Sequence, residues 1–465
     1  MPAPIIEGDV IKILLVRPNY KSHIITPPIG LGYLASYLKK NGIEANILDG
    51  LRDNLNNESL KKLIVNQQPD AVGITCLTAF YSTVVSLSRM LKQAGLRVII
   101  GGVHPTVLPF DTLRDSGCDY IIAGEGEKAL LQLARNHFNH QGIRGVYANK
   151  DIATREPVLK KAEVVQNLDS LPFPDWEQMA PGTYPKAPHG AIVKNYPVGV
   201  ITSSRGCPFR CTFCASPKLC DRRIRYRSPE SVVDEIKLLV QRFGVKEIHF
   251  EDDNFTLKRS RVMNICRLIV EEKLDISWAC PNGIRADKVD LGLLSLMKES
   301  GCYSVAYGVE SANQAILDTI KKQERLEAME KAIELTAKVG ISCQGFFVFG
   351  LPGESRETIE KSISFAKHSK LERAQFLILD VLPGSELWET LSGSFSPNWA
   401  KNSYKEPEWL PGNLTKIELL RAQSRAFREF YLKSPRRLFK MMSMIRPGQI
   451  RYILRRLLEY RIIKN

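Results

Sequence analysis

Two stretches of the chain alternate short β-branched runs with amphipathic segments. Between residues 10 and 148, each apolar run is followed by a segment with helical periodicity. This alternation is typical of βαβ units in a parallel, doubly wound sheet, so we expect a Rossmann-like domain over 10–148. The expected strands cover 11–16, 45–48, 71–75, 98–100 and 120–123, with helices near 30–41, 58–68, 80–94, 105–116 and 126–139.

The alternation stops and then returns. Residues 149–192 hold many prolines and no sustained period, which indicates a linker. Over 193–390, six strand–helix units suit a partial (β/α)6 barrel, and Ser228 and Gly244 are natural start and end signals for one of its helices. The expected barrel strands cover 198–203, 246–251, 276–279, 303–309, 343–349 and 375–381.

A basic helical region is expected over 391–465. The net charge of the 465-residue chain is +15, and residues 433–465 hold ten Lys or Arg against one acidic residue. This charge favours an anionic partner, and the amphipathic pattern suits contact with a membrane surface. An apolar face packed on the barrel is an equal alternative. Nucleic acid is not expected, because the sequence contains no recognised RNA-binding module.

Export signals are missing from the pattern. The start of the chain lacks a basic segment followed by an apolar run, and no stretch is apolar enough to cross a bilayer. With ten cysteines, this predicts reduced thiols in the cytoplasm, with peripheral contact at the inner membrane surface through the tail. Seven cysteines are expected as small core residues: Cys76, Cys118, Cys220, Cys266, Cys280, Cys302 and Cys343.

The other three cysteines share one short loop. Cys207, Cys211 and Cys214 are close enough in sequence to meet at one metal centre, and sulfur ligands select zinc, copper(I) or an iron–sulfur cluster. A closed zinc site or an ordinary cubane takes four protein ligands, and no fourth Cys or His follows at a matching spacing. Three ligands leave one iron of a four-iron cluster open for a substrate. Three buried or zinc-binding cysteines are the alternative.

The CxxxCxxC spacing, with Phe213 before the last cysteine, resembles the signature of the radical S-adenosylmethionine (SAM) superfamily. The resemblance implies a [4Fe-4S] cluster on the three cysteines, with SAM chelated to the open iron. It also implies one-electron cleavage of SAM to methionine and a 5′-deoxyadenosyl radical, with flavodoxin or ferredoxin as the reductant. Phe213 is similar to the aromatic residue that packs beside the adenine in that family.

An acidic motif follows the second expected barrel strand. Glu251, Asp252 and Asp253 are costly to bury without a cation. In the family this position contacts the ammonium of SAM, and we prefer Asp252 for that role. A solvated acidic turn is the alternative.

Two further motifs follow in the order that the family shows. Glu310 ends the fourth barrel strand and resembles the ribose-binding glutamate, with Ser311 beside it. Gly350 lies in a glycine-containing segment that allows close backbone approach and resembles the adenine side of the site. Arg285 is a candidate for pairing with the SAM carboxylate, and a structural salt bridge is equally consistent with the sequence.

Small residues occupy the expected strand ends of the first domain, which favours a broad, flat ligand close to the backbone. Gly-Gly-x-His-Pro-Thr followed by Gly-Glu-Gly-Glu resembles the cobalamin-binding domain found upstream of many radical SAM cores. The sequence lacks the Asp-x-His-x-x-Gly motif, so we expect no protein imidazole on cobalt. A Rossmann-like scaffold without a ligand is the alternative. The candidate cobalamin contacts are Thr75, Gly101, Gly102, His104, Gly124, Glu125 and Gly126.

Together the resemblances imply a cobalamin-dependent radical SAM enzyme that methylates an unactivated carbon of a small-molecule or lipid substrate. A radical SAM oxidative cyclase or ring-rearranging enzyme, like the anaerobic porphyrin-ring cyclases, is the first alternative. A non-catalytic cobalamin or redox sensor is the second, and it belongs to another class of protein.

Overall fold

The computed structural model describes residues 10–22, 24–152, 159–186, 193–399, 407–443 and 450. These divide into two compact units, and each is described by itself. The first comprises the described residues up to Tyr184, with Leu382–Gly384 and the stretch that begins at Asn398. The boundary therefore falls inside the segment 149–192 that we expected to be a linker.

A six-stranded sheet in the order β2-β1-β3-β4-β5-β6 forms the centre of the first unit. Its first five strands are parallel, as expected, and β6 joins the edge antiparallel to β5. The sequence did not predict this sixth strand. The strands are β1 (Lys12–Arg17), β2 (Glu44–Asp49), β3 (Ala71–Thr75), β4 (Val98–Gly101), β5 (Tyr120–Ile122) and β6 (Val146–Ala148).

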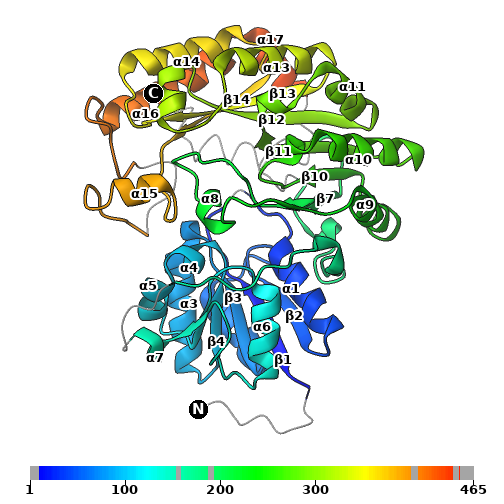
Figure 1. Cartoon of the computed structure of the whole chain (residues 1–465), viewed down its shortest axis with the longest axis vertical. Coiled ribbons are helices and arrows are strands. Elements are labelled where there is room, and N and C mark those ends of the chain that lie inside the picture. The colour runs from blue at the N-terminus through cyan, green and yellow to red at the C-terminus, as the bar shows by residue number, and fades with distance from the viewer. Residues whose placement is uncertain are drawn as a thin grey trace. The chain divides into compact units, whose positions relative to one another are not determined.

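Helices cover both faces of this sheet, as Figure 1 shows. Apolar residues of α1 and α6 pack on one face, and those of α2, α3 and α5 pack on the other. Burial on both faces explains the continuous apolar runs in the strands. The helices are α1 (Ile29–Lys40), α2 (Asn57–Gln67), α3 (Tyr81–Gln93), α4 (Val103–Val107), α5 (Pro109–Ser116), α6 (Gly126–Arg135) and α7 (Asn149–Ile152).

The second unit contains a six-stranded parallel sheet in the order β14-β13-β12-β11-β10-β7. Each neighbour in the sheet is the next barrel strand in the chain, which is the arrangement of a partial (β/α)6 barrel. A hairpin of β8 (Ser204–Arg205) and β9 (Arg225–Tyr226) lies outside it. The barrel strands are β7 (Val198–Ile201), β10 (Glu247–Phe250), β11 (Ser277–Ile284), β12 (Cys302–Glu310), β13 (Ser342–Phe349) and β14 (Arg373–Ile378).

Helices connect these strands. The Ser228 side chain accepts the Ser231 N–H at the start of α9, and Gly244 ends the helix in a left-handed conformation, which confirms both expected signals. The helices are α8 (Ser216–Leu219), α9 (Pro229–Phe243), α10 (Arg259–Glu271), α11 (Leu291–Glu299), α12 (Gln314–Thr319), α13 (Leu326–Lys338), α14 (Arg356–His368), α15 (Glu386–Thr390), α16 (Lys416–Phe427) and α17 (Pro435–Ser443), with a π-helical turn at Arg428–Leu432.

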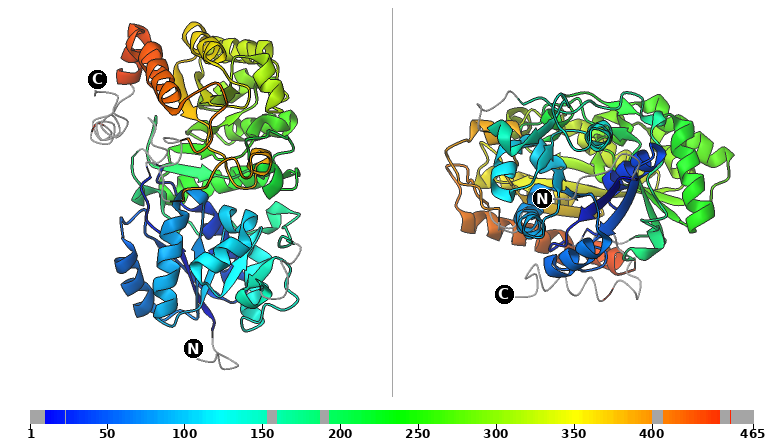
Figure 2. Two further views of the ribbon diagram at one scale, coloured as in Figure 1. Left: turned by 90° about the vertical axis from the view of Figure 1, so that its left-hand side faces the viewer. Right: turned by 90° about the horizontal axis from the view of Figure 1, so that it is seen from below.

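The C-terminal helices cover the edge strand β14 (Figure 2). Gln423 donates to the Phe376 carbonyl at 2.7 Å, and the Tyr431 hydroxyl bonds to both the N–H and the carbonyl of Ala374. Side chains thus satisfy backbone groups that an edge strand leaves unpaired. This part of the tail packs on the barrel. Most of the helical pattern expected beyond residue 443 lies outside the described residues.

Candidate active site

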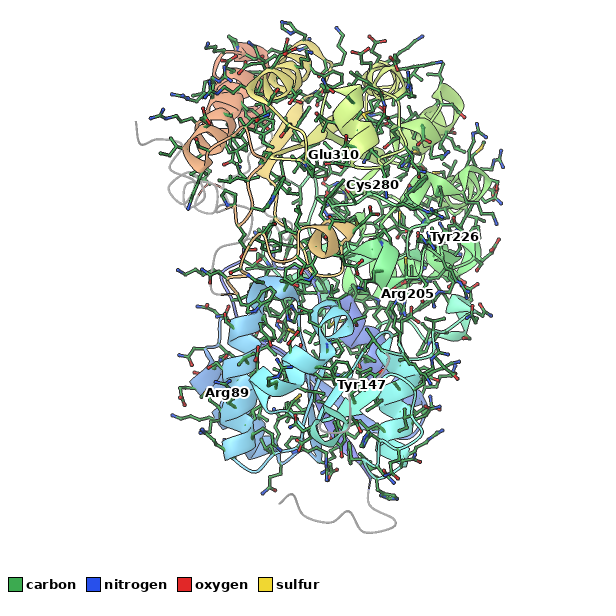
Figure 3. The ribbon with its side chains drawn as sticks, turned by 60° about the vertical axis from the view of Figure 1, so that its left-hand side comes forward. Arg89, Tyr147, Arg205, Tyr226, Cys280 and Glu310 are labelled. Carbon is green, nitrogen blue, oxygen red and sulfur yellow. The ribbon has the colours of Figure 1, made fainter. Side chains whose placement is uncertain are left out.

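The cysteine loop runs from the hairpin to α8 in the second unit. Figure 3 labels Arg205 and Tyr226 on the two strands of that hairpin. The loop is fixed at Thr212, whose N–H donates to the Ile320 carbonyl at 2.9 Å and whose carbonyl accepts the Leu387 N–H at 2.9 Å. Two distant segments of the chain therefore hold the loop at the carboxyl ends of the barrel strands, where parallel barrels carry their chemistry.

The three cysteines of the loop are half-buried and influence one another electrostatically. Burial, with the neighbouring thiols and Asp253 adding to it, raises the pKa of Cys207 to about 11 and that of Cys214 to about 12. Metal binding removes such protons outright. In the described part of the chain no group of three or more Cys, His, Asp or Glu side chains is spaced for a single ion. A cubane differs, because it is a multi-iron centre held by several thiolates.

Cys220 belongs to this loop and not to the core. Its sulfur accepts the Cys207 N–H at 3.3 Å and donates to the Ser216 carbonyl at 2.9 Å. The expectation that it is a core residue was wrong, because the sequence does not show that the chain brings Cys220 back to Cys207. The other six cysteines expected in the core are buried there.

The acidic motif after β10 separates into two environments. Asp252 is buried and accepts the Ser203 N–H at 2.7 Å and the hydroxyl groups of Ser203 and Ser204. Its carboxylate therefore fixes the chain between β7 and β8. From the sequence we had preferred this residue as the contact to SAM. Asp253 is exposed, accepts from Ser216 at 2.8 Å, and is close enough to Cys207 and Cys214 to raise their pKa.

Glu310 lies at the end of β12 in a left-handed backbone conformation, with φ of +61°. Its side chain folds back over Gly308, where a Cβ would lie 2.4 Å from the Glu310 carboxylate. The carboxylate accepts from the Lys322 ammonium at 3.1 Å, and Glu324 lies 3.5 Å from the same ammonium. The sequence did not predict Lys322 or Glu324. Lys322 also opposes the rise in the Cys211 pKa caused by burial, so this charge cluster adjoins the cysteine loop.

Arg285 makes its polar contacts with the protein itself. It donates to Asp287 at 2.8 Å and to the carbonyls of Lys322 and Gln323. Its guanidinium carbon lies 3.6 Å from the centroid of the Phe209 ring in the cysteine loop. The structure thus gives Arg285 the salt bridge that the sequence left open, and it braces the loop between Cys207 and Cys211.

Several buried polar atoms after the barrel strands have no hydrogen-bond partner among the described residues. They include both amide atoms of Asn254 after β10, the Ser311 hydroxyl after β12 and one oxygen of Glu354 after β13. The other Glu354 oxygen accepts the Gly350 and Leu351 N–H groups. Buried polar groups are rarely unsatisfied without a reason, so this rim of the barrel has the donors and acceptors that a polar ligand requires. The sequence named Ser311 but not Asn254 or Glu354.

The candidate residues of the first unit lie at or just after the carboxyl ends of β3, β4 and β5. His104 is fully buried, with Nδ1 3.1 Å from the Thr78 hydroxyl and its ring stacked on Tyr81 at 4.0 Å. Trp399 meets the same ring edge-on at 5.1 Å. Burial lowers the pKa of His104 to about 4, so the imidazole is neutral at pH 7. Its Nε2 has no partner within the described ranges.

Close packing inside the protein explains most of the glycines in this group. A Cβ at Gly102 would lie 2.6 Å from the Cys76 carbonyl oxygen, and one at Gly124 would lie 3.0 Å from the Ala162 nitrogen. Glu125 accepts the Val165 N–H at 3.0 Å. Gly126 faces Leu34, whereas Gly101 has only a distant neighbour and Thr75 is half-buried at the end of β3. Of the glycines, Gly101 is the one that internal packing does not explain.

Comparisons with known proteins agree with both halves of the chain. The radical SAM superfamily matches residues 201–366, and the B12 binding domain matches residues 20–134. An uncharacterised methyltransferase of Pyrococcus horikoshii is 34% identical over 440 residues, which are 91% of this chain and 93% of that protein. A cytidylyl-2-hydroxyethylphosphonate methyltransferase of Streptomyces wedmorensis is 30% identical, covering 81% of this chain and 80% of the relative.

One more relative and one solved structure extend the comparison. The anaerobic magnesium-protoporphyrin IX monomethyl ester cyclase of Rubrivivax gelatinosus is 28% identical over 90% of this chain and 77% of its own length. The radical SAM methyltransferase TsrM from Kitasatospora setae, solved with cobalamin and a [4Fe-4S] cluster, has the same fold. Its TM-score is 0.70 at 18% identity, over 95% of this chain and 90% of that one.

The chain belongs to the family of cobalamin-dependent radical SAM enzymes. Its cofactors are a [4Fe-4S] cluster, SAM and cobalamin. This confirms the predicted fold class, the cofactors and the prediction that the protein is an enzyme, and it disfavours a non-catalytic sensor. The residues suit these groups: three clustered thiols for iron, and unsatisfied polar atoms on the barrel rim for SAM.

Proposed function

We propose that this enzyme transfers a methyl group to an unactivated carbon of a small-molecule or lipid substrate. The observation that carries the proposal is that the two relatives above with at least 30% identity are both methyltransferases, matched over most of their length. When bound, SAM supplies a 5′-deoxyadenosyl radical after one-electron cleavage, and cobalamin supplies the methyl group.

Cys207, Cys211 and Cys214 would hold the cluster. Thr212 fixes the loop between the last two, and the Arg285–Phe209 contact braces it between the first two. The loop is therefore preorganised by contacts outside the cysteines, which keeps the thiols at one place on the barrel rim.

Polar groups on the rim would bind SAM. Asp253, beside the cysteines, and the unpartnered amide of Asn254 are our candidates for the amino acid end. Glu310 and Ser311 are candidates for the ribose, because one is an oriented carboxylate and the other an unpartnered buried hydroxyl.

Other residues act around these contacts. Phe213 in the cysteine loop and Gly350 after β13 are candidates for the adenine. Glu251 flanks the acidic end, with its carbonyl accepting from Asn282 at 3.1 Å. Asp252 and Arg285 are positioning residues, since the hydrogen bonds of Asp252 hold Ser203 and Ser204 and the Arg285 guanidinium packs on Phe209 of the cysteine loop.

In the first unit we propose that cobalamin lies over the carboxyl ends of β3, β4 and β5. The sheet order reverses between β1 and β3, and such switch points are where open α/β sheets bind ligands. Thr75, Gly101 and Glu125 offer surface and backbone there. His104 would support this surface from below as a neutral, buried ring, not as a ligand of cobalt.

Anaerobic reconstitution with iron, sulfide and cobalamin tests the proposal. With SAM, a strong reductant and an extract of small molecules, we expect 5′-deoxyadenosine, S-adenosylhomocysteine and a product heavier by one methylene unit in mass spectrometry. Variants Cys207→Ala, Cys211→Ala and Cys214→Ala should each abolish 5′-deoxyadenosine formation. If 5′-deoxyadenosine forms without S-adenosylhomocysteine or a methylated product, methyl transfer is refuted. A product that loses hydrogen and closes a ring would favour the cyclase alternative, which the Rubrivivax relative supports.

We propose that the enzyme is cytoplasmic and touches an anionic membrane through its C-terminal helices. All ten cysteines are free thiols, as a reducing compartment requires. No helix among the described residues is long and apolar enough to cross a membrane. In the tail, Phe439 is 75% exposed and Leu432 is 56% exposed, and Lys433 and Arg436 are exposed beside them.

Vesicle co-sedimentation tests this contact. Binding to phosphatidylglycerol vesicles should exceed binding to phosphatidylcholine vesicles, and Leu432→Ser/Phe439→Ser should lower it at least fivefold. Ile417→Ser is the matched control, because Ile417 is 61% exposed on α16. Equal binding by the double variant and the control would refute the contact and leave the tail as a cover for β14.

A further inference from the structure

A short turn, Asp221–Arg223, lies against the cysteine loop of the second unit. A Cβ at Gly206 would lie 2.2 Å from the Arg223 carbonyl oxygen and 2.9 Å from the Cys220 Cβ. The sulfur of Cys220 accepts the Cys207 N–H at 3.3 Å. The turn therefore packs against Gly206, the residue before the cluster motif, and Cys220, the residue before the turn, contacts Cys207.

The backbone of this turn is strained. Asp221 and Arg222 have φ of +51° and +56°, and neither is glycine. A left-handed backbone conformation costs free energy in a residue other than glycine, and two in succession persist only where contacts of the surrounding structure hold them. Here the conformation leaves Arg222 and Arg223 exposed at the surface while the backbone stays packed on Gly206.

The surroundings of the turn are strongly basic. Residues 205–227 contain seven Lys or Arg and one acidic residue, Asp221. Arg210, Arg222 and Arg223 are exposed, and Lys258 lies near the hairpin, 5.8 Å from the Tyr226 ring. Part of this charge is neutralised, because Arg227 is buried and paired with Glu235 and because Lys218 pairs with Glu389. Asp221 and Asp253 add exposed negative charge, whereas Arg210, Arg222, Arg223 and Lys258 outnumber them. The surface beside the cysteine loop remains positive.

Cleavage of SAM to the 5′-deoxyadenosyl radical takes one electron, which must come from outside the chain. The arriving donor must approach the cysteines closely, because the cluster they hold receives the electron. A surface with several exposed cations favours a donor with an acidic face, since complementary charge speeds encounter and fixes orientation.

We propose that the basic turn at Arg222 and Arg223, beside the cysteine loop, is the docking surface for an acidic one-electron carrier protein. The carrier loses one electron, the oxidised [4Fe-4S] cluster gains it, and no proton or other co-reactant is needed. The inference rests on the radical SAM chemistry of the proposed function and adds the surface through which that chemistry is driven.

Charge reversal tests the surface with the reconstituted full chain. Arg222→Glu/Arg223→Glu is compared with Arg242→Glu/Arg267→Glu, which makes the same change in net charge at exposed positions on α9 and α10. The probe is an acidic flavodoxin. Its Kd is measured with the oxidised protein, and electron paramagnetic resonance follows cluster reduction by the reduced protein. Dithionite, which needs no docking surface, is the control reductant.

We expect the turn variant to weaken flavodoxin binding and to slow flavodoxin-driven reduction at least tenfold, with less than a twofold change in the control variant. Dithionite should reduce the cluster equally in all three proteins, and raising the salt concentration should weaken binding only where the arginines are present. Equal effects of the two double variants would overturn the proposal. So would loss of dithionite reduction in the turn variant, because the turn would then serve only to hold the loop. The binding measurement does not depend on turnover, so failure of methyl transfer would leave it decisive.

Discussion

Lys322 offers the sharpest test of how the barrel rim is held together. Its ammonium is buried, with 8% of the residue exposed, and lies 3.1 Å from Glu310 and 3.5 Å from Glu324. At an effective dielectric constant of about 20, Coulomb's law gives roughly 5 kcal/mol of attraction to each carboxylate, before the opposing cost of desolvation. Removing one partner from a buried pair costs about 3–5 kcal/mol, because the remaining charge has lost its counterion.

We therefore predict that Lys322→Met lowers the stability of the second unit by about 3 kcal/mol or more. The lower end of the range applies because Glu324 keeps the Ala286 N–H at 2.8 Å and has Arg285 3.8 Å away. Among the described residues, the Glu310 carboxylate has no partner other than Lys322. Denaturant-dependent hydrogen exchange of peptides from β12 and β13 measures this unit separately from the first.

Lys321→Met is the matched control. Lys321 is the preceding residue, its side chain is half exposed, and its ammonium lies 2.6 Å from the half-exposed Glu386. An exposed pair contributes little, so we expect no measurable change. The carboxylates raise the pKa of Lys322, so its stabilisation is fully present below the pKa of an unfolded lysine and is lost only as pH rises through the higher folded value. The difference between wild type and Lys322→Met should therefore stay constant from pH 6 to 9. A loss below about 1 kcal/mol would refute the reasoning.

Three further predictions concern the same unit. Burial raises the pKa of Glu354 to about 7, whereas the unfolded carboxyl ionises near its usual 4.5. Relative to Glu354→Gln, wild type should therefore lose roughly 1.4 kcal/mol of stability between pH 6 and 8. Parallel pH profiles of the two proteins in guanidinium unfolding would contradict this. Gly206→Ala should lower iron and sulfide content sharply, because φ is +98° and the new Cβ meets the Arg223 carbonyl, whereas Gly412→Ala, with no atom within 4 Å, should load normally. Asp252→Asn should reduce stability by about 1–3 kcal/mol and lower iron content, because an amide nitrogen cannot accept the hydrogen bonds that Ser203 and Ser204 donate. Unchanged iron content would mean that Asp252 does not hold the loop.

Local chemistry made the elements predictable. Strand positions followed from short β-branched runs that must be buried on both faces, and the helix after the cysteine loop followed from Ser228 and Gly244. The antiparallel strand β6 was not predicted, because three residues at the edge of a sheet give too short a pattern to distinguish from a loop.

Proximity at the site was predictable where the motif is local. Cys207, Cys211 and Cys214 share one loop, so their spacing alone brought them together. Which of Asp252 and Asp253 is buried was not predictable, because the side chains of adjacent residues lie in different surroundings. Only the position of Ser203 and Ser204 decides which carboxylate accepts hydrogen bonds inside the protein. Arg285 was ambiguous for the same reason.

The sequence by itself determined the parallel strands of both sheets, the three-cysteine loop and the order of the motifs, because each depends on residues that are neighbours in the chain. Only the tertiary structure decided that Lys322 holds Glu310 and that Cys220 returns to Cys207. These contacts join segments whose separation in sequence carries no periodic signal, and their energies depend on burial, which exists only once the barrel has folded.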